Sequence, residues 1–256
     1  MHLDKIKYQF DILVRSLGSD KKPENFIAAI KPIMILIPAY NEAENLNVLL
    51  KKMPRSVCGK EVGVLVIDDG SMDDTSLVPN REGYVCVKNI INRGQGAACR
   101  LGYDLLRDEN VEVLVTMDAD NQHLPEDIKT LVKPIEENEF DLVIGSRIIG
   151  SHESEDRFRG IGISVLTKII NLITGLKLTD CSSGFKAFNV NELKRIHLRE
   201  DQFQSSEVII ESAKKGLRVG EVPITIVKRK FGDSKKGTNW RYGFKFTKVI
   251  IKTWWR

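Results

Sequence analysis

Residues 111–127 read VEVLVTMDADNQHLPED, a short apolar run followed by a cluster of acids and amides and then by the start of a helix. The run 111–117 has the length and the nearly continuous apolar character of a strand that is buried on both faces. Runs 33–37 and 62–67 are likewise followed by polar clusters. This repetition predicts parallel strands whose carboxyl ends meet at one edge of a sheet, where function is expected in such folds.

Outward from this stretch, apolar runs alternate with amphipathic segments. The predicted strands are 33–37, 62–67, 84–89, 111–117 and 141–145, and the predicted helices between them are 42–53, 94–107 and 125–137. The alternation predicts an α/β fold with a mainly parallel, doubly wound sheet and helices on both faces. After residue 150 we expect helices near 161–174 and 206–214, strands near 184–188 and 219–227, and a terminal helix from about 239.

The composition of the 256-residue chain is that of a globular protein, with 42% hydrophobic and 29% charged residues. It excludes a disordered, collagen-like or disulfide-stapled chain. The uncharged stretches are far shorter than the roughly 20 apolar residues of a membrane span, and no signal peptide is recognisable. The four cysteines lack CxxC spacing and have apolar neighbours, so we expect reduced, mostly buried thiols in a cytoplasmic protein.

Positive charge is concentrated towards residue 256. Residues 214–256 contain 13 lysines and arginines against two acids, Glu221 and Asp233, although the whole chain has a net charge of only +4. A basic segment on an acidic body predicts an anionic partner, either nucleic acid, phosphate groups or a membrane surface. The alternative is a solvated charged face.

The polar residues after the first two strands have structural and functional interpretations. Asn41 with Glu44, and Ser71 with Asp74, match patterns that cap helices. Four further residues exceed what capping and a turn require, and these are Tyr40, Glu42, Asp68 and Asp69.

Asp118 and Asp120, followed by Gln122, form the cluster after the fourth strand. Carboxylate and amide oxygens suit Mg²⁺ or Mn²⁺, which are typically held by one or two carboxylates together with substrate phosphates. D-x-D occurs by chance in many proteins, but its position at a strand end favours a metal site. An EF-hand is excluded because the glycine and the twelfth-position glutamate of that loop are missing.

Two further motifs suit anions. NRGQGAA (92–98) could direct backbone N–H groups at an anion, although a tight packing turn explains it equally well. It is not the dinucleotide fingerprint, because Cys99 stands where the third glycine is required. RKFGDSKK (229–236) follows the last strand and could close over a diphosphate, with a solvated basic loop as the alternative.

Together these pieces resemble the family 2 glycosyltransferases. The matching series is PAYNE (38–42), DDGS (68–71), NRGQGAA (92–98), DADNQH (118–123), GSR (145–147) and DCSSGFKAF (180–188), with Arg229 and Lys235 after it. Within the family, the chain most resembles the group of dolichyl-phosphate mannose synthases and polyprenyl-phosphate hexosyltransferases. The resemblance implies the GT-A fold, a doubly wound α/β fold of nucleotide-diphospho-sugar transferases, and Mn²⁺ or Mg²⁺ as cofactor.

The resemblance also implies roles for individual residues. Contacts to the nucleotide sugar fall on Pro38, Tyr40, Glu42, Ile67, Asp69, Asp118, Ala119, Asp120, Arg229 and Lys235. Asp120 and Gln122 contact the metal, and the catalytic set is Asp118, Asp120 and Arg147. The acceptor phosphate is assigned to Arg147, Arg159 and Ser164, although the match thins at 150–165. DADNQHLPE departs from the DADLQHPPE common in mannose synthases, so mannose, glucose and N-acetylglucosamine all remain open.

The chemistry of the acceptor favours a lipid phosphate. A phosphate is already largely anionic near neutral pH and needs little help from a base, whereas a sugar hydroxyl needs one. Cys181, Ser182 and Ser183 stand where hydroxyl-acceptor relatives have an acidic pair, and the Q-x-x-R-W signature of processive synthases is missing. We expect inverting transfer of a hexose to polyprenyl (dolichyl) phosphate. A carbohydrate acceptor and a non-catalytic nucleotide-sugar-binding subunit are the alternatives.

The chain divides into a helical appendage (1–30), a GT-A catalytic domain (31–238) and a basic amphipathic helix (239–256). The basic stripe of this helix is Arg241, Lys245, Lys248, Lys252 and Arg256, and its apolar face is Trp240, Phe244, Thr247, Ile250, Ile251 and Trp254. Such a helix suits an anionic membrane surface, which predicts a peripheral protein on the cytoplasmic face and no nucleic-acid partner. The alternative is that the apolar face packs on the domain or on a second subunit of a homo-oligomer.

Overall fold

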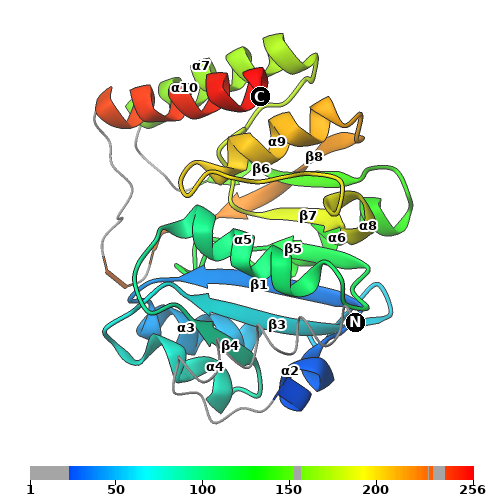
Figure 1. The fold of residues 1–256 in the computed structure, drawn as a ribbon, viewed down its shortest axis with the longest axis vertical. Helices are drawn as coiled ribbons and strands as arrows, with labels where there is room; N and C mark the ends of the chain where they lie inside the picture. Colours follow the sequence, from blue (N-terminus) through cyan, green and yellow to red (C-terminus); the bar gives the residue numbers. More distant parts are fainter. Residues whose placement is uncertain (1–22, 153–156, 230, 233–239) are drawn as a thin grey trace.

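The computed structural model describes residues 23–152, 157–229, 231–232 and 240–256 (Figure 1). The strands are β1 (Ile33–Ala39), β2 (Ser56–Val57), β3 (Lys60–Asp68), β4 (Val85–Lys88), β5 (Val113–Thr116), β6 (Leu142–His152), β7 (Lys186–Asn189) and β8 (Val219–Ile226). The α-helices are α2 (Pro23–Ala29), α3 (Ala43–Leu49), α4 (Val78–Arg81), α5 (Gln95–Leu106), α6 (Ile128–Glu136), α7 (Arg157–Thr174), α8 (Val190–Leu193), α9 (Gln204–Lys214) and α10 (Trp240–Trp255). Short 3₁₀ turns η1 (Leu50–Lys52), η2 (Asp74–Ser76) and η3 (Pro125–Asp127) adjoin α3, α4 and α6.

One sheet of eight strands organises these elements, in the order β2-β3-β1-β5-β7-β6-β8 with β4 also paired to β3. β1 runs parallel to β3 and β5, and β6 runs parallel to β8. β7 is antiparallel to both of its neighbours, and the short β2 is antiparallel to β3. The predicted mainly parallel sheet is confirmed.

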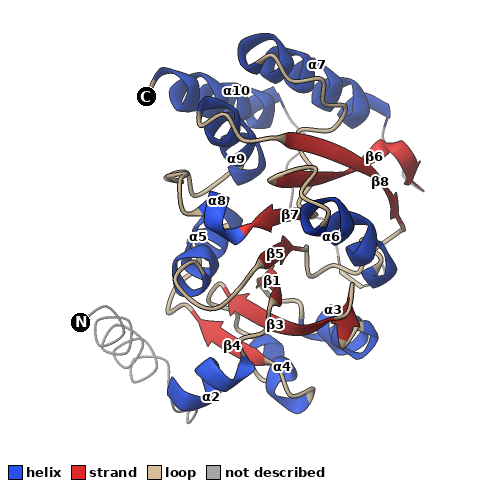
Figure 2. Ribbon diagram, turned by 90° about the vertical axis from the view of Figure 1, so that its right-hand side faces the viewer, coloured by secondary structure: helices blue, strands red, loops and turns tan. Residues whose placement is uncertain are grey.

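Two hydrophobic clusters cover the two faces of the sheet. In β1, Met34 and Leu36 belong to one cluster, whereas Ile33, Ile35 and Ile37 belong to the other. This division follows from strand geometry, because successive side chains point to opposite faces. The first cluster includes residues of α5, α7, α9 and α10, and the second includes residues of α3, α4 and α6 (Figure 2). Helices therefore cover both faces, as predicted.

Helix α2 lies within the segment 1–30 that the sequence predicts to be an appendage. Residues 1–22 lie outside the described residues, but α2 follows them and buries Phe26 in the first cluster at 5% exposure. Ile30 also packs against this cluster. Phe26 and Ile30 thus pack on the same core as residues of β3 and β4.

The prediction of reduced, mostly buried cysteines is confirmed in part, since Cys86 is only half-buried and Cys58 is exposed. All four thiols are free, and Cys99 and Cys181 are buried. Burial raises the pKa of the Cys99 thiol to about 12 and that of Cys181 to about 11, which keeps both groups protonated and unreactive near neutral pH. Cys58 is exposed, because it lies in the tight turn between β2 and β3 with a positive φ of 50°.

Helices α7 and α10 lie side by side outside α9, at the top of Figure 1. Phe246 and Ile250 of α10 are 4% and 1% exposed and belong to the core. Ile250 was predicted on an apolar face shared with Phe244 and Ile251, but these two remain 68% and 54% exposed. The predicted apolar face is therefore split between the domain and solvent. Within the described residues, no helix has both the length and the apolarity to cross a bilayer.

Candidate active site

The carboxyl ends of β1, β3 and β5 meet at one edge of the sheet. The register pairs Ala39 with Asp68 and Leu36 with Thr116, so the segments that follow these strands emerge together. This edge carries most of the residues assigned by resemblance, namely Tyr40, Glu42, Asp69, Asp118, Ala119, Asp120 and Gln122. Pro38 and Ile67 pair within the sheet just before it and are buried.

Arg229 joins the two sides of this edge. Its Nη2 donates to Oε1 and Oε2 of Glu42 at 2.5 and 2.7 Å, and its Nη1 lies 3.6 Å from Oδ2 of Asp120. Its Nε donates to the carbonyl of Phe231 at 2.7 Å, which holds the segment after β8 over the site. Glu42 is only 9% exposed and also accepts from Asn45 Nδ2 at 2.6 Å. A guanidinium so placed offers its charge to a phosphate that enters the edge.

Asp69 holds the glycine-rich segment from inside the protein. Its carboxylate accepts from the backbone N–H groups of Arg93 and Gly94, the latter at 2.7 Å, and from Asn89 Nδ2. Gly94 has a φ of 100°, and a Cβ on Gly96 would lie 2.6 Å from the backbone of Asp201. The anion at these N–H groups is the protein's own Asp69. The packing-turn interpretation of this motif is therefore confirmed.

Asp118 is held from two sides. Its Oδ1 accepts from Gln95 Nε2 at 2.6 Å, and a Cβ on Gly184 would come within 2.5 Å of the same oxygen. A side chain at position 184 would therefore displace the Asp118 carboxylate from this position. Gln95 is exposed at the start of α5 and contacts Asp118. It belongs to the NRGQGAA motif, but the sequence pattern assigned it no role.

Arg147, at the end of the GSR motif, forms an ion pair with the fully buried Asp180. Its Nε lies 2.6 Å from Oδ2 of Asp180, and its Nη2 donates to Ser182 Oγ at 2.7 Å. Burial alone would raise the pKa of Asp180, but the adjacent Arg147 guanidinium and the hydrogen bonds from Ser182 together outweigh burial and hold that pKa below its usual value. Arg147 is thus fixed against the DCSS segment.

Lys186 lies beneath the edge and was not selected from the sequence. It is 3% exposed, and its ammonium donates to the carbonyl of Ser183 and to Ser205 Oγ. Burial lowers the pKa of this ammonium to about 8, whereas the nearby charge of Asp118 acts in the opposite direction. A lysine inside the apolar strand of GFKAF was the available signal, since buried lysines are rare.

Both capping predictions at this edge are wrong. Asn41 adopts a left-handed φ of 52°, and its Oδ1 accepts from Met72 N, while α3 begins after Glu42 without a side-chain cap. Ser71 Oγ accepts from Asn41 N, and the residue that caps η2 is Asp73 rather than Ser71 or Asp74. Asn41 and Ser71 thus connect the loop after β1 to the loop after β3.

The donor set fits a hard divalent cation that also takes ligands from a substrate. Oδ1 of Asp120 accepts from Gln122 N at 3.2 Å, and Oδ2 faces Arg229. The amide nitrogen of Gln122 donates to the Val227 carbonyl at 3.3 Å, so a metal would meet the amide oxygen. Among the described residues, no group of three His, Cys, Asp or Glu side chains could hold a metal. Phosphate and water oxygens would therefore complete the coordination, as is usual for Mg²⁺.

Three assigned residues are not brought into this cluster. Ser164 is exposed on α7. Arg159 lies in the first turns of the same helix, and its side chain is outside the described residues. Lys235 is also outside the described residues.

The mixed α/β sheet with helices on both faces is that of the GT-A fold, and the comparisons agree. Residues 34–196 match the model of Glycosyl transferase family 2, and the chain belongs to this family. It is a glycosyltransferase by fold, motif set and kinship.

Two relatives and one solved structure show which proteins this chain is similar to. The UDP-N-acetylglucosamine–dolichyl-phosphate N-acetylglucosaminyltransferase of Methanococcus voltae is 30% identical, over 85% of this chain and 94% of that protein. The undecaprenyl-phosphate mannosyltransferase of Micrococcus luteus is 32% identical, over 79% of this chain and 86% of that protein. Glucosyl-3-phosphoglycerate synthase of Mycobacterium tuberculosis, crystallised with Mn²⁺ and UDP, has a TM-score of 0.70 at 18% identity, covering 90% of this chain and 82% of that one.

Proposed function

We propose that this protein transfers a hexose from a nucleotide-diphosphate sugar to a polyprenyl (dolichyl) phosphate, with inversion and with Mn²⁺ or Mg²⁺. The observation that carries the proposal is the contrast between the two relatives. Their printed names differ in the sugar, N-acetylglucosamine or mannose, but both name a polyprenyl-type lipid phosphate as the acceptor. The acceptor class is thus the shared property, and the hexose is left open among mannose, glucose and N-acetylglucosamine.

The donor occupies the edge formed by β1, β3 and β5. The proposed contacts are Pro38, Tyr40, Glu42, Ile67, Asp69, Asp118, Ala119, Asp120, Arg229 and Lys235. Because Pro38 and Ile67 are buried in the sheet, a nucleoside meets their backbone rather than their side chains. Arg229 moves its charge from Glu42 and Asp120 toward the diphosphate, since phosphate oxygens compete well for a guanidinium.

Asp120 and the amide oxygen of Gln122 hold the metal. When bound, the ion neutralises negative charge that develops on the departing diphosphate. Asp118 is kept in place by Gln95 at 2.6 Å, and it orients the donor against the same edge. Asp118 thus positions the donor, whereas Asp120 binds the metal.

The transfer step needs no strong base. An oxygen of the acceptor phosphate attacks the anomeric carbon of the hexose, the bond from that carbon to the diphosphate breaks, and the nucleoside diphosphate leaves with the electron pair. Arg147 is the proposed contact for the acceptor phosphate, and Arg159 and Ser164 of α7 are further candidates. Because Asp180 already neutralises Arg147, the acceptor phosphate shares that guanidinium rather than replacing the carboxylate.

A membrane surface supplies the acceptor. Large apolar side chains remain in solvent on both outer helices, and these are Val165, Leu172, Phe244, Ile251, Trp254 and Trp255. Lys245 and Lys248 are exposed beside them. Apolar and basic side chains together suit the interface of an anionic bilayer. We place the protein peripherally on the cytoplasmic face, and a second copy on the same helices is the competing occupant.

The test compares acceptors under one set of conditions. Labelled UDP- and GDP-hexoses are incubated with polyprenyl phosphate, with the corresponding polyprenol, or with free sugars, and the organic and aqueous phases are counted. We expect organic counts only with the phosphate. Equal transfer to the alcohol, or counts that remain in soluble saccharides, would favour the carbohydrate acceptor instead. A thermal-shift series with UDP- and GDP-sugars in Mn²⁺ then identifies the donor, since a bound ligand stabilises the fold.

A further inference from the structure

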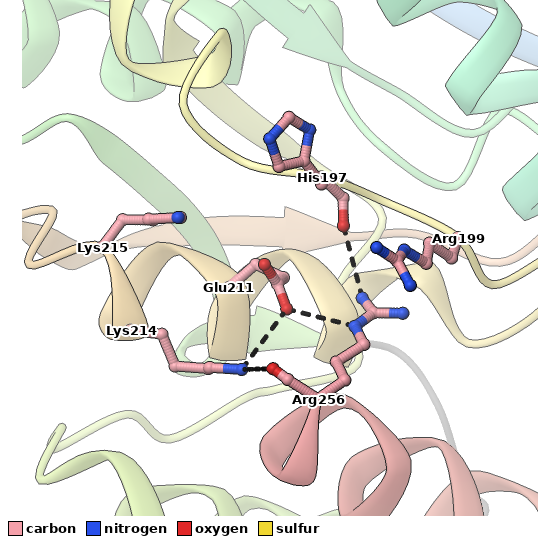
Figure 3. Close-up of a pocket in the computed structure, with 6 residues that line it drawn as sticks. All are labelled: His197, Arg199, Glu211, Lys214, Lys215 and Arg256. Atoms are coloured by element: carbon pink, nitrogen blue, oxygen red, sulfur yellow. Dashed lines mark hydrogen bonds and ion pairs between the residues drawn. The ribbon is translucent and has the colours of Figure 1, made fainter.

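A basic hollow lies at the end of α9, distinct from the edge at the carboxyl ends of β1, β3 and β5. It is lined by His197, Arg199, Glu211, Lys214, Lys215 and Arg256 and encloses about 320 Å³ (Figure 3). Ser205, at the start of α9, bonds Lys186 beneath the active site. Lys215 follows ten residues later, which places it roughly 15 Å along the helix direction from that end. Lys215 therefore lies away from the edge proposed to bind the donor.

Two cations of the basic hollow are already neutralised. Arg256 Nη2 donates to the buried Glu207 at 2.5 Å, and Nε donates to Glu211 at 3.3 Å. Lys214 Nζ donates to the carbonyl of Thr253 and lies 3.8 Å from Glu211. These contacts fix the walls of the hollow, because they tie α10 to α9.

Two other cations remain uncompensated. Arg199 and Lys215 are exposed, and no ion pair or hydrogen bond of their side chains is found among the described residues. In Figure 3 neither side chain is joined to the other residues drawn. Lys215 benefits from the partial negative charge at the end of α9, but that charge amounts to about half an electron. The hollow thus has a surplus of positive charge that an anion would balance.

We propose that the basic hollow binds a phosphate-bearing anion, with Arg199 and Lys215 as its principal contacts. Guanidinium groups bind phosphate oxygens bidentately, and lysine adds a point charge. The volume is near the lower end of the range for small-ligand sites, so a phosphate with a small substituent fits.

The nearest source of such a group is a lipid headgroup. Trp254 and Trp255, which directly precede Arg256, are 39% and 83% exposed. They belong to the surface proposed above to meet a membrane, and this part of the inference rests on that proposal. A soluble phosphate ester is the other source, and its binding does not depend on the membrane.

The experiment uses the Arg199→Gln/Lys215→Gln double variant, with Lys51→Gln/Lys129→Gln as a matched control. The control removes two exposed lysines of η1 and α6 that line no part of the hollow. Binding of glycerol 1-phosphate is measured by calorimetry. Sedimentation is measured with phosphatidylcholine vesicles that contain or lack phosphatidylglycerol. Sugar transfer to detergent-dispersed polyprenyl phosphate is followed in parallel, and we expect it to be unchanged in both variants.

We expect the hollow variant to lose about tenfold in affinity for glycerol 1-phosphate, while the control keeps wild-type affinity. A larger loss of binding to phosphatidylglycerol vesicles than in the control identifies the lipid headgroup as the source. Loss confined to glycerol 1-phosphate identifies a soluble ester. If both variants match in both assays, the inference is overturned, whatever the transfer assay shows about the proposed function.

Discussion

The edge formed by β1, β3 and β5 differs from the outer layer, which consists of α7 and α10, in how far its side chains are exposed. At the edge, acids are withdrawn from water and held by the protein, with Glu42 9%, Asp69 3% and Asp180 0% exposed. In the outer layer, Leu172 and Trp255 are 84% and 83% exposed. The edge is organised in advance for a small charged ligand. The layer leaves large apolar side chains in solvent, as surfaces that bind a large partner do.

The proposed function assigns each half of the reaction to a region. Under that proposal, the edge binds a soluble, charged donor, for which preorganised charge matters most. The layer would then meet an acceptor whose tail is apolar and whose phosphate alone must reach the edge. Substitutions in the two regions should therefore separate catalysis from membrane binding.

Of these substitutions, Asp120→Ala should reduce activity the most. We expect turnover to fall at least about a hundredfold, because the metal loses its carboxylate, while the fold survives since Asp120 is not part of the apolar core. Steady-state transfer assays measure the loss. EDTA should abolish the transfer activity of the wild type, and added Mn²⁺ or Mg²⁺ should restore it. Asp104→Ala, which removes an exposed acid of α5, is the control. Full activity in EDTA would reject the metal assignment.

Arg229→Ala tests the contact that crosses the edge. We expect nucleotide-sugar affinity to fall about tenfold to a hundredfold, since a charge-assisted hydrogen bond contributes about 1.5–3 kcal/mol. Calorimetric titration of the donor gives the dissociation constant. Arg81→Ala, at a surface pair with Asp74 separated by 4.0 Å, should leave it unchanged. Unaltered donor affinity in Arg229→Ala would mean that the arginine only pins the segment after β8.

Ile251→Ser/Trp255→Ser tests the outer layer. We expect binding to anionic vesicles to fall about tenfold, because two apolar contacts with the bilayer are lost, while transfer to detergent-dispersed acceptor continues. Vesicle sedimentation at several salt concentrations measures the effect, and added salt should weaken wild-type binding. Ile27→Ser/Leu77→Ser is the matched control, since both residues are about half exposed on other elements. A change of oligomeric state without loss of vesicle binding would show that a second copy covers this layer.

Lys186→Met has the smallest expected effect on function, because it concerns the stability of the fold. The folded protein releases the Lys186 proton near pH 8, whereas the unfolded chain retains it up to the usual pKa of 10.5. The wild type should therefore gain stability relative to Lys186→Met as the pH rises through this interval, by at most about 1.4 kcal/mol per pH unit. Urea unfolding at pH 7, 8, 9 and 10 measures the difference. Parallel stability curves would show that Lys186 is not buried as a cation.

The edge was predictable from the sequence because its residues follow strands. An apolar run ends where a polar cluster begins, so Asp69, Asp118 and Asp120 could be located from local patterns. Their partners could not, because Arg229 reaches Glu42 across 187 positions of the chain. Local capping patterns failed at Asn41 and Ser71 for the same reason, since contacts between loops replaced contacts along the chain.

The outer layer was less predictable. The periodicity of a sequence gives the angle of each side chain around a helix. It does not say which side of the helix packs against the domain. Arg256 was grouped with the basic stripe, yet it turns inward to Glu207 and Glu211, and Lys252 pairs with Glu200. The sequence contained these acids on α9 and in the loop before it, but only the packed structure brings them to α10.

The mass of the lipid product tests the central claim most directly. Wild-type protein, the identified nucleotide sugar, Mn²⁺ and polyprenyl phosphate of one chain length are incubated, and the lipid is analysed by mass spectrometry with Asp120→Ala as the blank. We expect a species heavier by one hexosyl unit that still carries a single phosphate, present with the wild type and nearly absent from the blank. A lipid diphosphate, or no new lipid beside consumed donor, would contradict transfer of the hexose to the lipid phosphate.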